Sequence, residues 1–308
     1  MYKFTPILKT LVWGTERWVL SGVPGNESVV AEGPEAGKKI TDLYPGQFPL
    51  LIKFIDAKRD LSIQVHPDNE LAAKRHGCSG KTEMWYVIGA EPGAKLISGL
   101  KEPITPDEYV RLVEQDRITD VLAEHAVAPG DVFFLPSGRI HAIGGGCYLA
   151  EIQQTSDITY RIYDYNRPGL DGKPRELHTE LAAKALDFHV EANYRTEYPN
   201  TSNKAIKVIK SPYFSIRVMD VSKPFHRDLM KYDSFIITMC IEGDCIIHVR
   251  STGEEVLLKE GSSTLIPAAI ADYDVLPRHD KTRILDAFID NMDRSLANTV
   301  TRFLHLRA

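Results

Sequence analysis

Four side chains in the first half of the chain are of types that bind divalent metals, and short strands can bring them together. They are Gln64, His66, Glu83 and His141, which we call the cage. Side chains of a strand alternate between its faces, so Ser62 shares one face with Gln64 and His66. A single histidine or glutamate of this kind is usually a surface or packing residue. Four potential ligands on matched strand faces instead predict one metal site.

The turn before His141 is expected to fix the position of this histidine. A short apolar run, 132–135, ends at Pro136-Ser137-Gly138, and a second apolar segment begins at Ile140. Proline presets φ for a tight turn, and Gly138 can take the positive φ that other residues resist. We therefore expect two strands joined by this turn. The spacing of glycine, proline, glycine and histidine resembles the second motif of the cupin superfamily.

Two further segments predict the strands that carry the other ligands. In 61–67 the apolar residues alternate with the polar ones, so an apolar face packs outward and a polar face points into a barrel. In 81–88 the same alternation places Lys81, Glu83 and Trp85 on one side. The cage is thus built from three strands of one small barrel.

The ligand types suit a metal that acts as an electrophile. Two neutral histidines, a neutral amide and one carboxylate leave a divalent ion with a net charge of about +1, so it stays a strong Lewis acid. Such an ion stabilises negative charge that develops on oxygen when a proton is removed next to a carbonyl. Zinc fits, although the glutamine is unusual for zinc and the ligand set also suits manganese, iron, cobalt or nickel.

Several segments, in order along the chain, resemble type I mannose-6-phosphate isomerases. They are Val12-Trp13-Gly14, residues 48–56, 61–68 and 80–86, and residues 151–161. Only 75 residues separate His66 from His141, so the chain resembles the short form of this family. The resemblance implies reversible conversion of mannose 6-phosphate to fructose 6-phosphate, with one bound divalent metal, usually zinc.

The resemblance also implies roles for individual residues. The family's ligands, in the order Gln, His, Glu and His, match the four residues of the cage. Its catalytic arginine matches Arg161, and its pocket lysine and serine match Lys81 and Ser62. Its pocket acidic residues match Glu151 and Asp157. The implied partner is a small sugar phosphate.

The chemistry leaves several assignments open at this point. Arg161 and Lys81 are the cations suited to the phosphate, and either could contact the sugar instead. The base that moves a proton between C1 and C2 is Glu151, Lys81 or a metal-bound water or hydroxide. Arg161 could stabilise the enediolate or serve as a structural partner of Asp157, and the two roles are compatible.

Composition indicates a compact enzyme of the cytoplasm. The 308 residues are 26% charged and 43% hydrophobic, an ordinary globular balance that suffices for two modest domains. A net charge of −5 gives no basic field for nucleic acid, and neither a run of 18 apolar residues nor a secretory leader points to a membrane. The spacing of the cysteines suggests no disulfide framework, so we expect reduced thiols. The sequence specifies no oligomeric state.

The predicted fold class is mainly β, with two cupin-type jelly-roll barrels and a few short helices. We assign residues 1–195 to a catalytic cupin barrel with a small helical segment, and 196–308 to a second, degenerate cupin-like domain. Gly261 to Pro267 repeats the glycine-to-proline spacing, but no histidine follows at the place of His141. Helices are expected at about 106–115, from 118 or 119 to before 128, and at 180–186. Strands of the second domain are expected at 208–209, 214–218, 234–240, 245–249 and 255–258.

Two other function classes compete with the isomerase. A cupin without turnover could bind a sugar as a sensor, but a carbohydrate binder has no need of a metal flanked by Lys81 and Arg161. A cupin oxygenase usually has a richer histidine set than a cage with Gln64 and Glu83. The sequence therefore favours the enzyme, and we expect the other eight histidines to be surface or packing residues.

Overall fold

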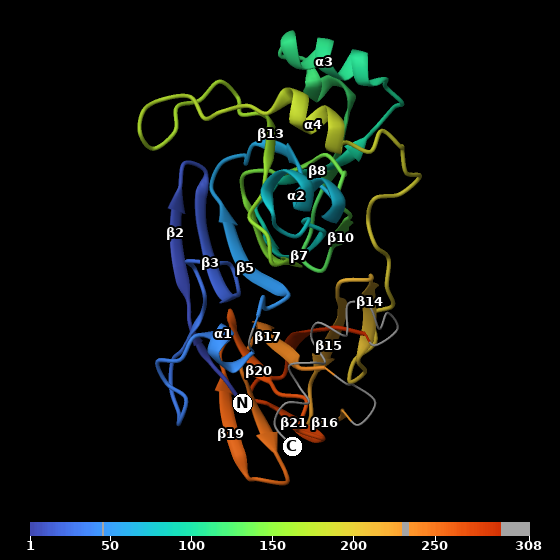
Figure 1. Cartoon of the computed structure of the whole chain (residues 1–308). Coiled ribbons are helices and arrows are strands. Elements are labelled where there is room, and N and C mark those ends of the chain that lie inside the picture. The colour runs from blue at the N-terminus through green and yellow to red at the C-terminus, as the bar shows by residue number, and fades with distance from the viewer. Residues whose placement is uncertain (45, 230–233, 291–308) are drawn as a thin grey trace. The chain divides into compact units, whose positions relative to one another are not determined.

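The computed structural model describes residues 1–44, 46–229 and 234–290, and it is mainly β with short helices, as predicted (Figure 1). The chain forms two compact units. The first barrel comprises Leu8–Trp18 and Leu51–Thr196; the second comprises the described residues of Met1–Ile7, of Val19–Leu50 and from Glu197 to 290. The first fifty residues thus contribute to both units. The domain limits 1–195 and 196–308 stay a prediction, and residues 291–308 lie outside the described residues.

The first barrel is built from two antiparallel sheets. The strands of the six-stranded sheet, in spatial order, are β10 (Val132–Leu135), β7 (Glu83–Ala90), β12 (Cys147–Gln154), β5 (Leu50–Ala57), β3 (Gly14–Ser21) and β2 (Ile7–Leu11). Those of the five-stranded sheet are β13 (Tyr160–Tyr163), β6 (Ile63–Val65), β11 (His141–Ile143), β8 (Lys95–Leu100) and β9 (Leu122–Ala126).

Apolar side chains fill two layers of the first barrel. One cluster takes residues from both sheets, among them Trp85, Phe133 and Leu96, and therefore lies between them. The other joins Ile63 and Val65 on the outward face of the five-stranded sheet to the helices that cover it. This is the outward apolar face that the alternation in 61–67 predicts, so the polar residues of β6 face the interior.

Short helices cover the first barrel, and two of the three lie where the sequence predicts helices. They are α2 (Asn69–His76), α3 (Pro106–Glu114) and α4 (Thr179–Ala185). Thr105 caps α3 because its hydroxyl accepts from the Glu108 amide, while the Glu108 carboxylate accepts from the Thr105 amide. The helices predicted at 106–115 and 180–186 are confirmed; Figure 1 shows α4 beside β13 and α3 above α4.

The helix predicted from residue 118 or 119 to before 128 is wrong. A single 3₁₀ turn, Ile118–Val121, leads directly into strand β9. Residues of β9 alternate between more buried and more exposed positions, and β9 pairs with β8 along the edge of the sheet. Pairing with this sheet edge outweighs the weak helical preference of so short a segment.

The second barrel also has two main sheets, with a two-stranded sheet and one short helix beside them. Its five-stranded sheet has the order β14 (Ile206–Lys210), β15 (Ser215–Val221), β22 (Thr282–Phe288), β17 (Ile236–Glu242) and β20 (Ser262–Ile266). Its four-stranded sheet has the order β16 (Phe225–Asp228), β21 (Asp272–Pro277), β18 (Cys245–Val249) and β19 (Glu254–Leu258). The others are β1 (Phe4–Thr5), β4 (Val29–Val30) and α1 (Ile40–Leu43). The five predicted strands of this domain are confirmed, whereas β16, β20, β21 and β22 are additional.

Candidate metal centre and active site

The four residues of the cage come together as the strands predict. His141 at the start of β11 pairs directly with Gln64 in β6, and His66 follows the end of β6. The two Nε2 atoms of His66 and His141 lie 3.2 Å apart, and Gln64 Nε2 lies 3.3 Å from His141 Nε2. The Glu83 carboxylate lies 3.3 Å from His141 Nε2 and 3.4 Å from His66 Nε2. All four side chains therefore converge on one point of the barrel interior.

The predicted turn holds both histidines in place. The Arg139 amide donates to the Pro136 carbonyl, and Gly138 has a φ of 91°, so the positive φ expected for this glycine is confirmed. The Gly138 amide donates to the His66 carbonyl over 2.9 Å. One tight turn thus ties the backbone of His66 to the strand that begins at His141.

Backbone carbonyls fix which nitrogen of each imidazole faces the cage. His66 Nδ1 donates to the Ile158 carbonyl at 2.9 Å, and His141 Nδ1 donates to the Arg139 carbonyl at 2.8 Å. Each Nε2 then keeps its lone pair for a ligand. Burial, with the Lys81 ammonium second, lowers the pKa of His66 to about 3, and burial also lowers the pKa of His141. Both rings are therefore neutral, as metal ligands must be.

The donor set fits a divalent metal. Of the described residues, only His66, Glu83 and His141 form a group of at least three metal-binding side chains. Oε1 of Glu83 is buried without a hydrogen-bond partner, as expected for an atom that an ion would bind. Burial alone would raise the pKa of Glu83, but Lys81 and the two imidazoles outweigh it and hold this pKa well below its usual range. Gln64 would ligate by turning its amide oxygen inward.

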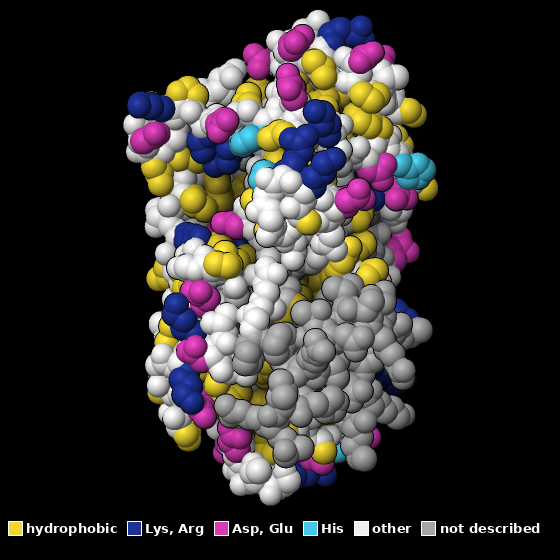
Figure 2. Space-filling view, viewed as in Figure 1, with side chains coloured by type: hydrophobic (Ala, Val, Ile, Leu, Met, Phe, Trp, Pro, Cys, Tyr) yellow, Lys and Arg dark blue, Asp and Glu magenta, His cyan; other side chains and the backbone are white. Residues whose placement is uncertain are grey.

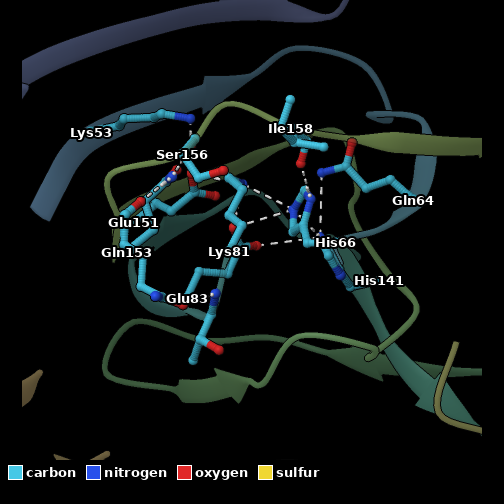
Figure 3. Close-up of polar contacts among 12 residues, drawn as sticks. Lys53, Gln64, His66, Lys81, Glu83, His141, Glu151, Gln153, Ser156 and Ile158 are labelled. Atoms are coloured by element: carbon cyan, nitrogen blue, oxygen red, sulfur yellow. Dashed lines mark hydrogen bonds and ion pairs between the residues drawn. The ribbon is translucent and has the colours of Figure 1, made fainter. Parts of the chain in front are cut away.

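Lys81 lies beside the cage. Its Nζ is 2.5 Å from Glu83 Oε2 and 2.9 Å from His66 Nε2 (Figure 3). The same Nζ lies 4.0 Å from Glu151 Oε1. The ammonium therefore stands between the metal ligands and a second buried carboxylate.

Glu151 is positioned by two side chains on neighbouring strands. Trp85 Nε1 donates to its Oε2 over 2.9 Å, and Lys53 Nζ lies 3.1 Å from its Oε1. Burial alone would lower the pKa of Lys53, but the carboxylates of Glu151 and Glu16 outweigh it and raise this pKa. Sequence reasoning missed Lys53, although a single lysine within the apolar run of β5 indicates a buried charge that needs acidic partners.

A cavity of about 370 Å³ opens beside these residues. Of the predicted site residues, Ser62, Gln64, Lys81, Glu151, Asp157 and Arg161 line it. It is also lined by Lys9, Glu16, Trp18, Lys53, Arg175 and His178, which sequence reasoning did not single out. Figure 2 shows Lys, Arg and His side chains gathered on the upper part of the visible face, where Figure 1 places α2, β13 and α4. Five lysines and arginines line the cavity against three carboxylates, so the cavity is suited to an anion.

Arg161 lies next to the cage. It pairs with Gln64 across β13 and β6, so both side chains lie on the same face of the sheet. Its Nη1 donates to the Glu176 carbonyl over 2.9 Å, while its Nε is buried without a hydrogen-bond partner. Burial and the neighbouring Arg175 lower the pKa of Arg161, so a bound anion would stabilise this cation.

Two expectations about neighbouring residues are corrected. Within the described chain, Asp157 forms no ion pair with Arg161, which is held instead by a backbone carbonyl. His178 is not simply a surface or packing residue, because it lines the cavity and its Nδ1 accepts from the Arg161 amide. A histidine seventeen positions away in sequence gives no signal of this contact.

Comparisons with known proteins agree with this geometry. A family model of the phosphomannose isomerase type I catalytic domain matches residues 17–85, and a model of the mannose-6-phosphate isomerase cupin domain matches residues 204–278. Mannose-6-phosphate isomerase ManA of Bacillus subtilis is 32% identical over 301 residues, covering 88% of this chain and 94% of that protein. A mannose-6-phosphate isomerase of Streptococcus mutans is 33% identical over 270 residues, covering 84% of each.

A solved structure extends the likeness to three dimensions. The crystal structure of the Bacillus subtilis mannose 6-phosphate isomerase matches with a TM-score of 0.84 at 30% identity, covering 93% of this chain and 98% of that one. No helix in the described part of the chain is long and apolar enough to cross a bilayer. By sequence and by fold, the chain belongs to the type I mannose-6-phosphate isomerase family.

Proposed function

We propose that this protein is a metal-dependent aldose-ketose isomerase that interconverts mannose 6-phosphate and fructose 6-phosphate through an enediolate. The observation that carries the proposal is the convergence of two neutral imidazoles and an unpartnered carboxylate oxygen at the edge of a cationic cavity. The names of the relatives supply mannose 6-phosphate as the substrate, and fructose 6-phosphate is the ketose that its aldose-ketose isomerisation forms.

Gln64, His66, Glu83 and His141 would hold one divalent ion, for which zinc is our first choice. The bound ion would supply Lewis-acid stabilisation of negative charge on the sugar oxygens. The protein supplies the orientation of the ligands, because the Ile158 and Arg139 carbonyls fix both imidazoles.

We assign proton transfer between C1 and C2 to Lys81 and Glu151. Their Nζ and Oε1 atoms lie 4.0 Å apart at the wall of the cavity, so a proton can be taken and returned at one place. Trp85 and Lys53 hold the Glu151 carboxylate in one orientation. Ser62 and Asp157, on the same wall, are left to bind the sugar hydroxyls.

Arg161 is the residue to which we assign stabilisation of the enediolate. It is the cross-strand neighbour of Gln64, so its guanidinium can reach an oxygen that the cage polarises. Its buried and unpartnered Nε offers a donor for negative charge that develops during the reaction.

A coupled assay with mannose 6-phosphate tests this function. The purified protein should form fructose 6-phosphate, lose this activity on chelation and regain it when zinc or another divalent metal is added. If no metallated sample forms fructose 6-phosphate, the isomerase proposal is wrong. Stoichiometric binding of mannose 6-phosphate without turnover would favour a sugar-binding sensor instead.

We also propose a cytoplasmic location. The four cysteines, Cys78, Cys147, Cys240 and Cys245, are all free, which suits a reducing compartment. Fractionation of cells that produce the protein, probed with an antibody, should recover it with cytoplasmic enzymes, and recovery in an extracellular fraction would contradict this.

A further inference from the structure

We propose that Lys9 binds the phosphate group of the substrate and so gives the site its preference for sugar 6-phosphates. The proposal rests on the isomerase function proposed above. Lys9 lies on the edge strand β2, lines the cavity and is half-buried.

A phosphate on C6 is separated from the reacting C1 and C2 by the length of the sugar, so it must meet a cation away from the cage. Lys81 contacts Glu83 and His66, and Arg161 is the neighbour of Gln64. Both cations that the sequence suggested for the phosphate therefore lie at the reacting end of the substrate. Another cation has to hold the phosphate.

Most other cations of the cavity wall already have carboxylate partners. Lys53 lies 3.1 Å from Glu151 and 3.8 Å from Glu16. Arg175 donates through Nε and Nη2 to both oxygens of Asp164, over 2.7 and 2.6 Å. A cation neutralised as Lys53 is attracts an anion weakly, because the carboxylates cancel most of its field. The Nε and Nη2 donors of Arg175 are already used on Asp164, a carboxylate that it shares with Arg167.

Lys9 differs because an aromatic ring holds it, not a carboxylate. Its Nζ lies 3.4 Å from the centroid of the Trp18 ring, and among the described residues it has no ion pair. The face of an indole attracts a cation but carries no net charge, so the ammonium keeps its full positive charge for a ligand. An ammonium has three N–H donors, and a single ring face cannot satisfy all three.

The ring itself is firmly placed. Trp18 is buried, and its Nε1 donates to Glu16 Oε2 over 2.6 Å. The Lys53 ammonium lies 5.1 Å from the centroid of the same ring. The Trp18 ring therefore holds the Lys9 side chain at the cavity wall before any ligand binds. Because the side chain is already ordered, it loses less conformational entropy on binding a phosphate.

Lys9→Met tests the proposal, because methionine keeps an apolar side chain over Trp18 and removes only the charge. The probe is mannitol 6-phosphate, which has no carbonyl and cannot be isomerised, titrated calorimetrically into the metal-loaded protein. We expect its Kd to rise about tenfold in Lys9→Met. Lys9→Arg should stay within about threefold of wild type. Lys101→Met, which removes an exposed lysine outside the cavity lining, is the matched control and should bind like wild type.

Kinetics with mannose 6-phosphate give a second readout. In Lys9→Met the KM should rise about tenfold while kcat changes by less than about twofold, because the phosphate is bound equally in ground state and transition state. A merely structural role would lower the Tm of Lys9→Met and leave the Kd and KM as in wild type.

The two proposals can fail separately. Equal Kd values for mannitol 6-phosphate in wild type and Lys9→Met, or no binding to wild type, would overturn the role of Lys9. A wild-type protein that binds mannitol 6-phosphate through Lys9 but never forms fructose 6-phosphate would overturn the isomerase function and leave the phosphate site standing.

Discussion

The first and second barrels share one strand order but hold different chemistry. Strands β10, β7, β12 and β5 of the first barrel lie in the same order as β20, β17, β22 and β15 of the second. Strands β6, β11, β8 and β9 likewise correspond to β16, β21, β18 and β19. In each barrel the corresponding strands follow the same order along the chain, so the two are versions of one jelly roll.

This correspondence identifies what replaces the cage in the second barrel. The spacing from Pro267 places Asp272 at the position of His141, but the first buried residue of β21 is Tyr273. Tyr273 pairs with Arg227 across β21 and β16 as His141 pairs with Gln64 across β11 and β6. Glu83 pairs with the residue before Pro136, and Ile236 pairs with the residue before Pro267. An arginine, a tyrosine and an isoleucine thus stand at positions that hold ligands in the first barrel.

One acidic position is kept in both barrels. Glu151 pairs with Trp85 across β12 and β7, and Asp286 pairs with Thr238 across β22 and β17. Arg227 Nη2 donates to Asp286 over 2.7 Å, and Thr238 donates to it over 2.8 Å. The carboxylate of Asp286 is therefore used within a closed buried network, whereas that of Glu151 lines a cavity. The same strand order supports stability in one barrel and, as we propose, chemistry in the other.

The largest expected effect comes from removing a ligand from the first barrel. In His141→Ala, loss of one of two imidazoles should abolish metal retention and reduce isomerase activity to background. Metal content by atomic emission and the coupled assay measure both. Tyr273→Phe, at the matched position of the second barrel, is the control and should keep metal and activity. Full metal content in His141→Ala would remove this residue from the site.

The second prediction concerns Arg161, which we expect to act in catalysis but not in metal binding. Arg161→Ala should keep one metal per chain and lower kcat by about 10²- to 10³-fold, since a donor to the developing oxyanion is lost. Metal content and kcat are measured on the same sample. Arg250→Ala, at an exposed arginine of the second barrel, should change neither. Wild-type kcat in Arg161→Ala would exclude it from the mechanism.

The backbone features of the site were predictable because they depend on short-range rules. Alternation placed Ser62, Gln64 and His66 on one face, and the needs of a tight turn placed Gly138. Each rule involves only residues close together in sequence. The likeness of 261–267 to the turn before His141 also indicated a second barrel, and strand β20 confirms its position.

The rest of the site depends on contacts between residues distant in sequence. Lys9 meets Trp18 because β2 and β3 are neighbours, and Lys53 meets Glu151 through strands nearly a hundred residues apart in the chain. The segment 122–126 becomes a strand only because β8 offers it an edge. Patterns within a short stretch of sequence do not indicate which strands will pair or which buried charges will come into contact.

The third prediction concerns the buried network of Arg227, Thr238 and Asp286 in the second barrel. Asp286→Ala leaves the Arg227 guanidinium buried without its carboxylate and should lower the free energy of unfolding by about 3–5 kcal/mol. Urea denaturation measures this. The double variant Arg227→Met/Asp286→Leu removes both charges and should recover most of the loss. If Asp286→Ala is as stable as wild type, the network does not stabilise the barrel.

The smallest expected effect is the pH dependence of the free energy of unfolding, measured on the metal-depleted protein. The pKa of His66 in the folded protein is about 3, below the usual 6.5, so between these values the unfolded chain binds one more proton than the folded chain. Stability is therefore fully present above pH 6.5 and is lost as pH falls, by about 2 kcal/mol from His66 at pH 5. Urea denaturation at pH 7 and pH 5 measures this loss. His66→Gln should reduce it, whereas His248→Gln, which changes a histidine of the second barrel outside its buried interior, should not. An equal pH dependence of stability in wild type and His66→Gln would show that burial does not hold the His66 imidazole neutral. The two barrels would then differ in the residues at the ligand positions but not in the pH dependence of their stability.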